Sequence, residues 1–195
     1  MKFLSKHKDS EILDEALVYK SKTDNSRLRF KLLDEQKNFC AYTEKYISKI
    51  DSTDVEHFNP SIKDKDDYYN YYTTLRYANE QKISKYEIYK NSNFFKSLFF
   101  QNEVEFKRRI FYDDFEYQIT DENDKEADDF KNYLGLNDDY LYSERMQHIE
   151  RLKSTIGSFS NEEKLVYFKK NKNDLSYPTA IEHEFHIDLS EIIND

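Results

Sequence analysis

The sequence predicts a mainly helical α+β domain. Apolar residues recur at helical spacing along most of the chain, and shorter stretches alternate apolar and polar side chains around polar turns, as strands do. Only 2 Gly and 2 Pro occur in 195 residues, whereas 17 Tyr and 15 Phe supply most of the material for a core. This length suits one domain, residues 1–195, with a helical C-terminal part over 121–195.

The first expected elements are two helices. Residues 9–20 carry four apolar side chains at helical spacing. A polar N-cap at 24–26 starts a second helix, on which Leu28 and Leu32 share a side. Both helices are expected to pack over the centre of the domain.

The middle of the chain is expected to hold a hairpin and a helix. Residues 41–50 and 54–58 are predicted to pair, with 51–53 as the turn and Pro60 ending the pairing. The helix is expected from about residue 74 to residue 84, where the pattern turns helical.

The remaining chain predicts one more hairpin and several helices. Residues 94–100, the most apolar segment, suit a buried helix or strand, and 104–112 with 115–120 suit a hairpin. Further helices are expected within 121–134 (closed by Gly135), from 137 to Gly157, over 160–170 and beyond Pro178.

Composition restricts the function. The net charge of −9 argues against a free-standing nucleic-acid binder, which normally carries a basic face. A single cysteine excludes an internal disulfide framework and fits a reducing compartment, so we expect a cytoplasmic location. No signal peptide is visible, and no apolar run reaches the length of a membrane span, so no membrane partner is expected.

Residues 54–82 contain the strongest chemical signal. Glu56 and His57 are adjacent, and Asn70 and Asn79 follow within a short loop and a helix. A histidine beside a carboxylate, with a further polar ligand nearby, suits a divalent ion and a general base in one cleft. In phosphodiester cleavage the ion neutralises the phosphate, and an uncharged imidazole deprotonates the attacking water.

These motifs resemble the HNH endonucleases, whose core is a ββα-metal unit. The segments that match are Glu-His-Phe-x-Pro, Tyr-Tyr-Asn and Asn-x-x-Lys, and the implied core covers 36–85. The resemblance implies that Glu56 and Asn79 hold one Mg²⁺ or Mn²⁺ ion and that His57 is the general base. It also implies that Asn70 braces the loop and orients the histidine. Arg76 and Lys82, on the expected helix beside the metal, are the candidate phosphate contacts.

A wider likeness is to the PtuB-like HNH proteins of the Septu and retron anti-phage systems. That family usually has four cysteines around the core, of which only Cys40 is present here. Thr43, Leu75 and Ala78 occupy the other three positions. One cysteine cannot supply the four ligands of a structural zinc, so no structural zinc is expected. The resemblance also implies an ATPase as protein partner.

Together these observations predict a metal-dependent endonuclease that hydrolyses phosphodiester bonds of DNA, or of RNA as the second choice. It is expected to act as the effector of a bacterial anti-phage system, with a partner supplying the nucleic-acid groove. The alternative is a catalytically inactive interaction subunit with an HNH fold, which the acidic charge and the lost cysteines favour.

One basic run remains open. Residues 107–109, Lys-Arg-Arg, have aromatic neighbours and suit either contact with a phosphate or base, or a solvated strand edge.

Overall fold

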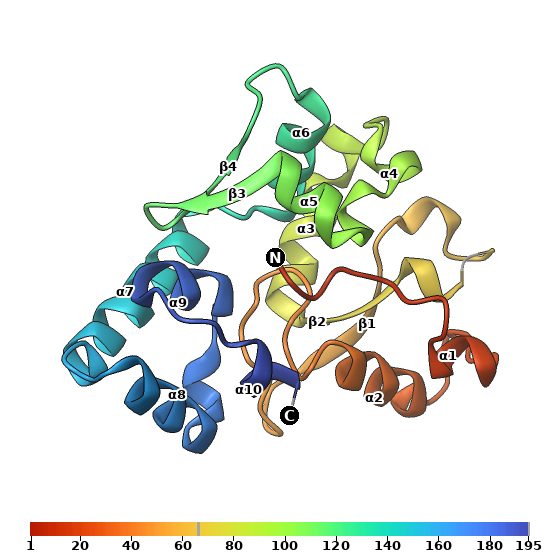
Figure 1. Ribbon diagram of the computed structural model, residues 1–195. Coiled ribbons are helices and arrows are strands. Elements are labelled where there is room, and N and C mark those ends of the chain that lie inside the picture. Colours follow the sequence, from red (N-terminus) through yellow and green to blue (C-terminus); the bar gives the residue numbers. More distant parts are fainter. Residues whose placement is uncertain (66, 195) are drawn as a thin grey trace.

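The computed structural model describes residues 1–65 and 67–194 and is mainly helical, with two small antiparallel sheets (Figure 1). The helices are α1 (Glu11–Asp14), α2 (Ser26–Glu35), α3 (Arg76–Tyr89), α4 (Phe94–Ser97), α5 (Glu103–Arg109), α6 (Lys125–Leu134), α7 (Asp139–Ile156), α8 (Asn161–Lys170), α9 (Pro178–Phe185) and α10 (Ser190–Asn194). Helices α7 to α10 gather on one side of the molecule, and the first sheet with α1 and α2 lies on the other.

The first sheet consists of β1 (Thr53–His57) and β2 (Tyr71–Leu75), and α3 follows β2 without a loop. Glu56 pairs with Tyr72, and His57 pairs with Tyr71. The predicted pairing of 41–50 with 54–58 is therefore wrong.

Two physical reasons account for this difference. Glu44 adopts a positive φ of 59°, which turns the chain out of an extended path inside the expected first strand. The Tyr-Tyr-Thr-Thr sequence of β2 combines aromatic and β-branched side chains, which suit a buried strand. Residues 39–46 keep one isolated bridge, between Phe39 and Tyr46.

The second sheet confirms the second predicted hairpin in part. Strands β3 (Ile110–Asp113) and β4 (Glu116–Ile119) pair around Asp114, but residues 103–109 form helix α5 instead of a longer strand. The side chain of Asn102 caps α5 by accepting hydrogen bonds from the amides of Val104 and Glu105. This local cap outweighs the alternating pattern.

The helices were predicted best where capping signals mark their ends. Gly135 ends α6 in the left-handed conformation at φ 63°, a capping box at Ser160 starts α8, and Pro178 starts α9. The first helix is much shorter than predicted, since α1 ends at Asp14 and Ala16 adopts φ 49°. Helix α2 matches its prediction, with Leu28 and Leu32 buried.

The β1–β2 hairpin lies between two apolar clusters. Tyr72 faces the main core, where Phe58 packs on Phe100 with ring centroids 4.4 Å apart. Tyr71, its neighbour in the strand, faces a second cluster that includes Leu28 of α2. Because neighbouring strand residues point to opposite faces, this arrangement fixes the register of β2 and hence the position of β1.

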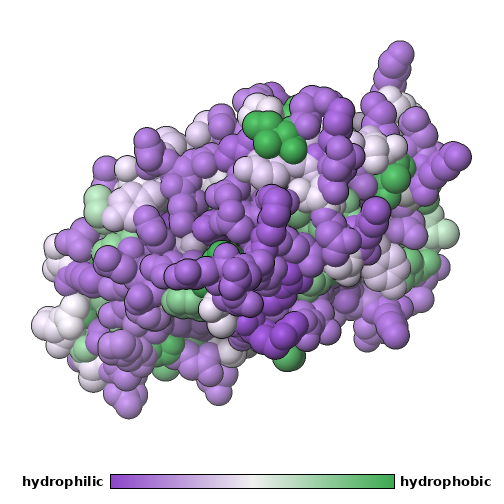
Figure 2. Space-filling view, turned by 90° about the horizontal axis from the view of Figure 1, so that it is seen from above, coloured by the Kyte–Doolittle hydropathy of each residue, from purple (hydrophilic) through white to green (hydrophobic). Residues whose placement is uncertain are grey.

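The surface view shows a largely hydrophilic face with apolar side chains scattered singly or in small groups (Figure 2). Over residues 1–65 and 67–194, no helix has the length and apolar character needed to cross a membrane.

Glu44 is a buried carboxylate that joins three separate parts of the chain. It accepts hydrogen bonds from the amide of Lys2 at 2.7 Å, the hydroxyl of Tyr117 at 3.1 Å and the hydroxyl of Thr179 at 2.9 Å. The Met1 ammonium lies 3.6 Å away. Burial alone would raise the pKa of Glu44, but the ammonium and these hydrogen bonds outweigh it and hold the pKa below 4.5.

We therefore expect Glu44 to contribute to acid denaturation. Because its folded-state pKa is depressed, its stabilisation is present above pH 4.5 and is lost as pH falls through the folded-state pKa. Glu44→Gln should lower the melting temperature at neutral pH but flatten its decline over the acid range. Thermal denaturation of both proteins over a series of pH values would test this. The prediction is contradicted if the melting temperatures of the two proteins decline equally steeply in acid.

Candidate active site

Glu56, His57 and Asn79 line one open cleft of about 500 Å³. Glu56 and His57 lie at the end of β1, and Asn79 lies in the first turn of α3. Residues 23–26 and Arg29, from the segment before α2 and its first turn, also line the cleft. The hairpin and the helix that follows it therefore bring together three of the side chains that the sequence singled out.

Glu56 is 6% exposed and forms an ion pair with Lys82, which is fully buried. The Lys82 ammonium also donates to the carbonyl oxygens of His57, at 2.7 Å, and Phe58, at 3.2 Å. Burial lowers the pKa of Lys82 to about 7, because the charged form loses its hydration. The adjacent Glu56 carboxylate opposes that effect by favouring the ammonium.

The sequence singled out Lys82 as a phosphate contact beside the metal, and the structure buries its side chain. Its ammonium faces Glu56 and the end of β1, so contact with a phosphate would require Lys82 to leave this pair. Arg76, the other expected contact, is exposed but pairs with Asp54 at 3.3 Å.

The His57 imidazole is held between two tyrosine rings. Tyr19 meets it edge-on at 4.7 Å between centroids, and Tyr71 meets it at 5.5 Å. Tyr71 is also connected to Tyr19 through a hydrogen bond from the Tyr19 amide to the Tyr71 hydroxyl at 3.4 Å. These rings restrict the rotation of the imidazole while leaving His57 on the wall of the cleft.

Asn70 braces the loop that follows His57. Its side-chain oxygen accepts from the Asn59 amide at 2.7 Å, and its side-chain nitrogen donates to the Asn59 carbonyl at 3.0 Å. The Phe58 amide donates to the Asn70 carbonyl at 2.8 Å. A single buried amide side chain thus fixes the backbone immediately after His57.

The side-chain oxygen Oδ1 of Asn79 is buried and has no hydrogen-bond donor among the described residues. A buried acceptor without a donor is costly, and a water molecule or a ligand that reached this oxygen would remove that cost. Within the described ranges, no three His, Cys, Asp or Glu side chains gather as a metal-binding cluster. Any ion here would rely on one carboxylate, one amide and solvent or substrate oxygens.

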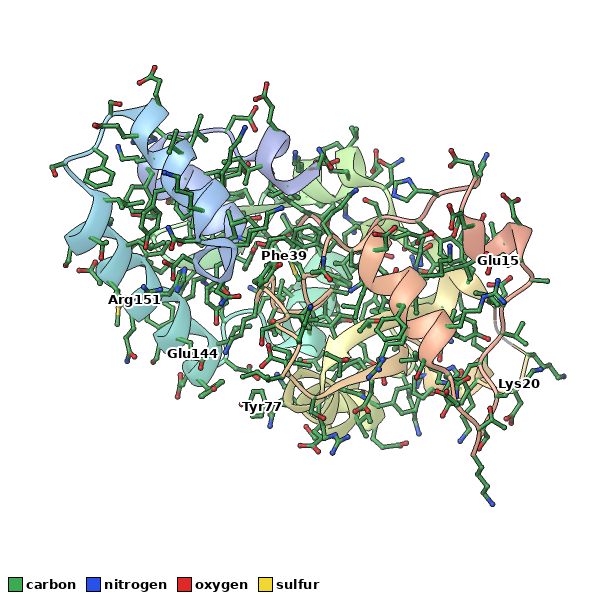
Figure 3. The ribbon with its side chains drawn as sticks, turned by 90° about the horizontal axis from the view of Figure 1, so that it is seen from below. Glu15, Lys20, Phe39, Tyr77, Glu144 and Arg151 are labelled. Atoms are coloured by element: carbon green, nitrogen blue, oxygen red, sulfur yellow. The ribbon has the colours of Figure 1, made fainter. Side chains whose placement is uncertain are left out.

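Cys40, Thr43, Leu75 and Ala78, the four positions that the sequence resemblance singled out, lie close together. The Leu75 amide donates to the Cys40 sulfur at 3.4 Å, and Thr43, Leu75 and Ala78 line a cavity of about 70 Å³. Tyr77 of α3 and Glu144 of α7 also line this cavity, and both are labelled in Figure 3.

The basic run at 107–109 lies on α5 and is engaged within the chain. Lys107 pairs with Glu103 at 2.6 Å, and Arg108 pairs with Glu105 at 2.8 Å. Arg109 pairs with Asp124 and Glu126. These ion pairs weaken the interpretation of this run as a nucleic-acid contact.

Comparison with known protein families, with curated proteins and with solved structures finds no match for this chain.

Sequence reasoning missed two residues of the cleft, Tyr19 and Arg29. Tyr19 lies beyond α1, in the part of 9–20 that the sequence assigned to a helix and the structure does not form as one. No sequence feature distinguishes Arg29 from Arg27, which does not line the cleft and pairs with Glu15 at 2.8 Å.

Proposed function

We propose that the protein is a metal-dependent HNH endonuclease that hydrolyses phosphodiester bonds of DNA, with RNA as the second candidate. The main observation in support is that the Asn79 side-chain oxygen is a buried acceptor with no donor among the described residues. It lies on the same cleft as Glu56 and His57. An acceptor of this kind fits a hard divalent cation, which takes oxygen ligands.

Glu56 and Asn79 would hold one Mg²⁺ or Mn²⁺ ion. When bound, the ion would neutralise the phosphate and stabilise the leaving oxygen. His57 would accept the proton of the attacking water, with its ring kept in place by Tyr19 and Tyr71. The hydrogen bonds between the Asn70 side chain and the Asn59 backbone would hold the chain after His57 in place, and so keep the base on the wall of the cleft.

The proposal includes a place in anti-phage defence and an ATPase partner. Its support is the resemblance of residues 40–82 to the PtuB-like proteins, together with the charge of −9, which calls for a partner that supplies a basic groove.

Calorimetric titration with Mn²⁺ tests the proposed site. We expect binding by the wild type and at least about tenfold weaker binding by Asn79→Ala, because one of two protein ligands is lost. Asn91→Ala, an exposed asparagine in the turn after α3, is the matched control and should bind like the wild type. Equal affinity in Asn79→Ala and the wild type would contradict the assignment.

A second candidate function is a catalytically inactive interaction subunit of a defence complex. The observation that favours it is the Lys82 ammonium, which already neutralises Glu56 without a metal ion. This candidate predicts that wild-type protein releases no more heat on Mn²⁺ addition than buffer does, and that Glu56→Ala leaves partner binding unchanged.

A further inference from the structure

Arg29 is a cation on the wall of the cleft that forms no ion pair with a described carboxylate, although the charge of Asp24, on the same wall, interacts with it electrostatically. It lies on α2 and lines the same cleft as Glu56, His57 and Asn79. Its Nε is buried and has no hydrogen-bond acceptor within the described part of the chain. A buried guanidinium nitrogen without an acceptor is as costly as a buried acceptor without a donor, and it indicates an anionic ligand.

The other charged groups of the cleft are already engaged. Asp54 pairs with Arg76 at 3.3 Å, and Glu56 pairs with Lys82. Asp24, which also lines the cleft, accepts a hydrogen bond from the Ser26 amide at 2.8 Å. Arg29 is therefore the described cation of the cleft that is available to an incoming anion.

The backbone around Arg29 supports the same conclusion. Arg29 lies in the first turns of α2, where the amides of a helix favour negative charge. The N-cap residue, Asn25, makes no side-chain hydrogen bond to the first turn, so that end of the helix keeps part of its hydrogen-bonding capacity. The backbone of Arg29 is also anchored to β2, because the Arg29 carbonyl accepts a hydrogen bond from the Thr73 hydroxyl at 3.4 Å.

We propose that Arg29 binds a phosphate of the nucleic-acid backbone in this cleft, which the candidate catalytic side chains also line. The identity of the anion as a nucleic-acid phosphate rests on the proposed function. A guanidinium presents paired N–H donors that match two phosphate oxygens, which neither an ion-paired Arg76 nor a buried Lys82 can offer. Arg29 thereby takes the role that the sequence assigned to Arg76 and Lys82.

The test measures binding separately from cleavage. A short fluorescein-labelled DNA duplex and a single-stranded RNA of the same length are titrated by fluorescence anisotropy in Mg²⁺ over a range of salt concentrations. The proteins are His57→Ala, used to prevent cleavage, and the same variant combined with Arg29→Ala, Arg29→Lys or Arg27→Ala. Arg27→Ala is the matched control, because it removes the same charge from the same helix outside the cleft.

Arg29→Ala is expected to weaken binding about tenfold, as the loss of one charge-assisted contact does. It should also reduce the slope of log K against log salt by about 0.9 for the duplex, the value for one phosphate contact. Arg29→Lys should restore part of the affinity, and Arg27→Ala should match the parent. Circular dichroism of each variant confirms that the fold is kept.

Three results would overturn the inference: equal effects of Arg29→Ala and Arg27→Ala, an unchanged salt slope, or no binding of either probe by the parent. Cleavage by the wild type separates this inference from the proposed function. If the wild type cleaves and Arg29→Ala cleaves equally well at low substrate, the inference fails and the nuclease stands. If the parent binds through Arg29 but the wild type never cleaves, the nuclease fails and the phosphate site stands.

Discussion

Substitution of His57 by alanine is expected to lower the rate of phosphodiester hydrolysis at least about a hundredfold, because a positioned general base contributes that much or more. The fold should remain intact, since the imidazole is only partly buried and its tyrosine neighbours belong to the second apolar cluster and its margin. The rate is measured with bis(p-nitrophenyl) phosphate and Mn²⁺, a small substrate that does not depend on a nucleic-acid groove.

His7→Ala is the matched control for this experiment. His7 is exposed and lies outside the cleft, so its removal should leave the rate unchanged. Equal rates for His57→Ala and the wild type, in folded protein, would remove His57 from the chemistry.

Substitution of Lys82 by alanine is expected to lower the free energy of unfolding by about 3–5 kcal/mol, the usual cost of breaking a buried ion pair. The change would leave the Glu56 carboxylate buried without its partner and would remove a donor from the His57 and Phe58 carbonyls. Urea denaturation provides the measurement.

Two further variants show whether the cost comes from the unpaired charge. Lys85→Ala removes a lysine of the same helix that pairs with Asp138 near the surface, and should cost about 0–1 kcal/mol. The double variant Glu56→Gln/Lys82→Met should recover most of the stability lost in Lys82→Ala. A Lys82→Ala cost as small as that of Lys85→Ala would contradict the account of this pair.

Helix ends were predictable because their signals are local. The capping box at Ser160, the left-handed Gly135 and Pro178 at the start of α9 each act within a few residues. The partner of β1 was not predictable in the same way, because strand pairing depends on which distant segment is buried beside it. Tyr71 and Tyr72 decide that question by facing two different clusters, an outcome that local alternation does not contain.

The same distinction between local signals and tertiary packing applies to the candidate site. Motif spacing was sufficient to select Glu56, His57 and Asn79, and these residues do line one cleft. Lys82 was selected as a phosphate contact because its helix was expected to place it near the metal, but the packing of α3 against the end of β1 buries its side chain. Arg29 was missed because only the tertiary structure distinguishes it from Arg27.

The central claim is metal-dependent cleavage of nucleic acid by the cleft of Glu56, His57 and Asn79. Its most direct test is incubation of supercoiled plasmid and of total RNA with Mn²⁺ or Mg²⁺, comparing wild type with His57→Ala. Parallel lanes contain a chelator or the proposed ATPase partner. The account predicts cleavage by the wild type that both the chelator and His57→Ala abolish. Intact plasmid and RNA in every wild-type lane, including those with the ATPase, would contradict it and favour the interaction subunit.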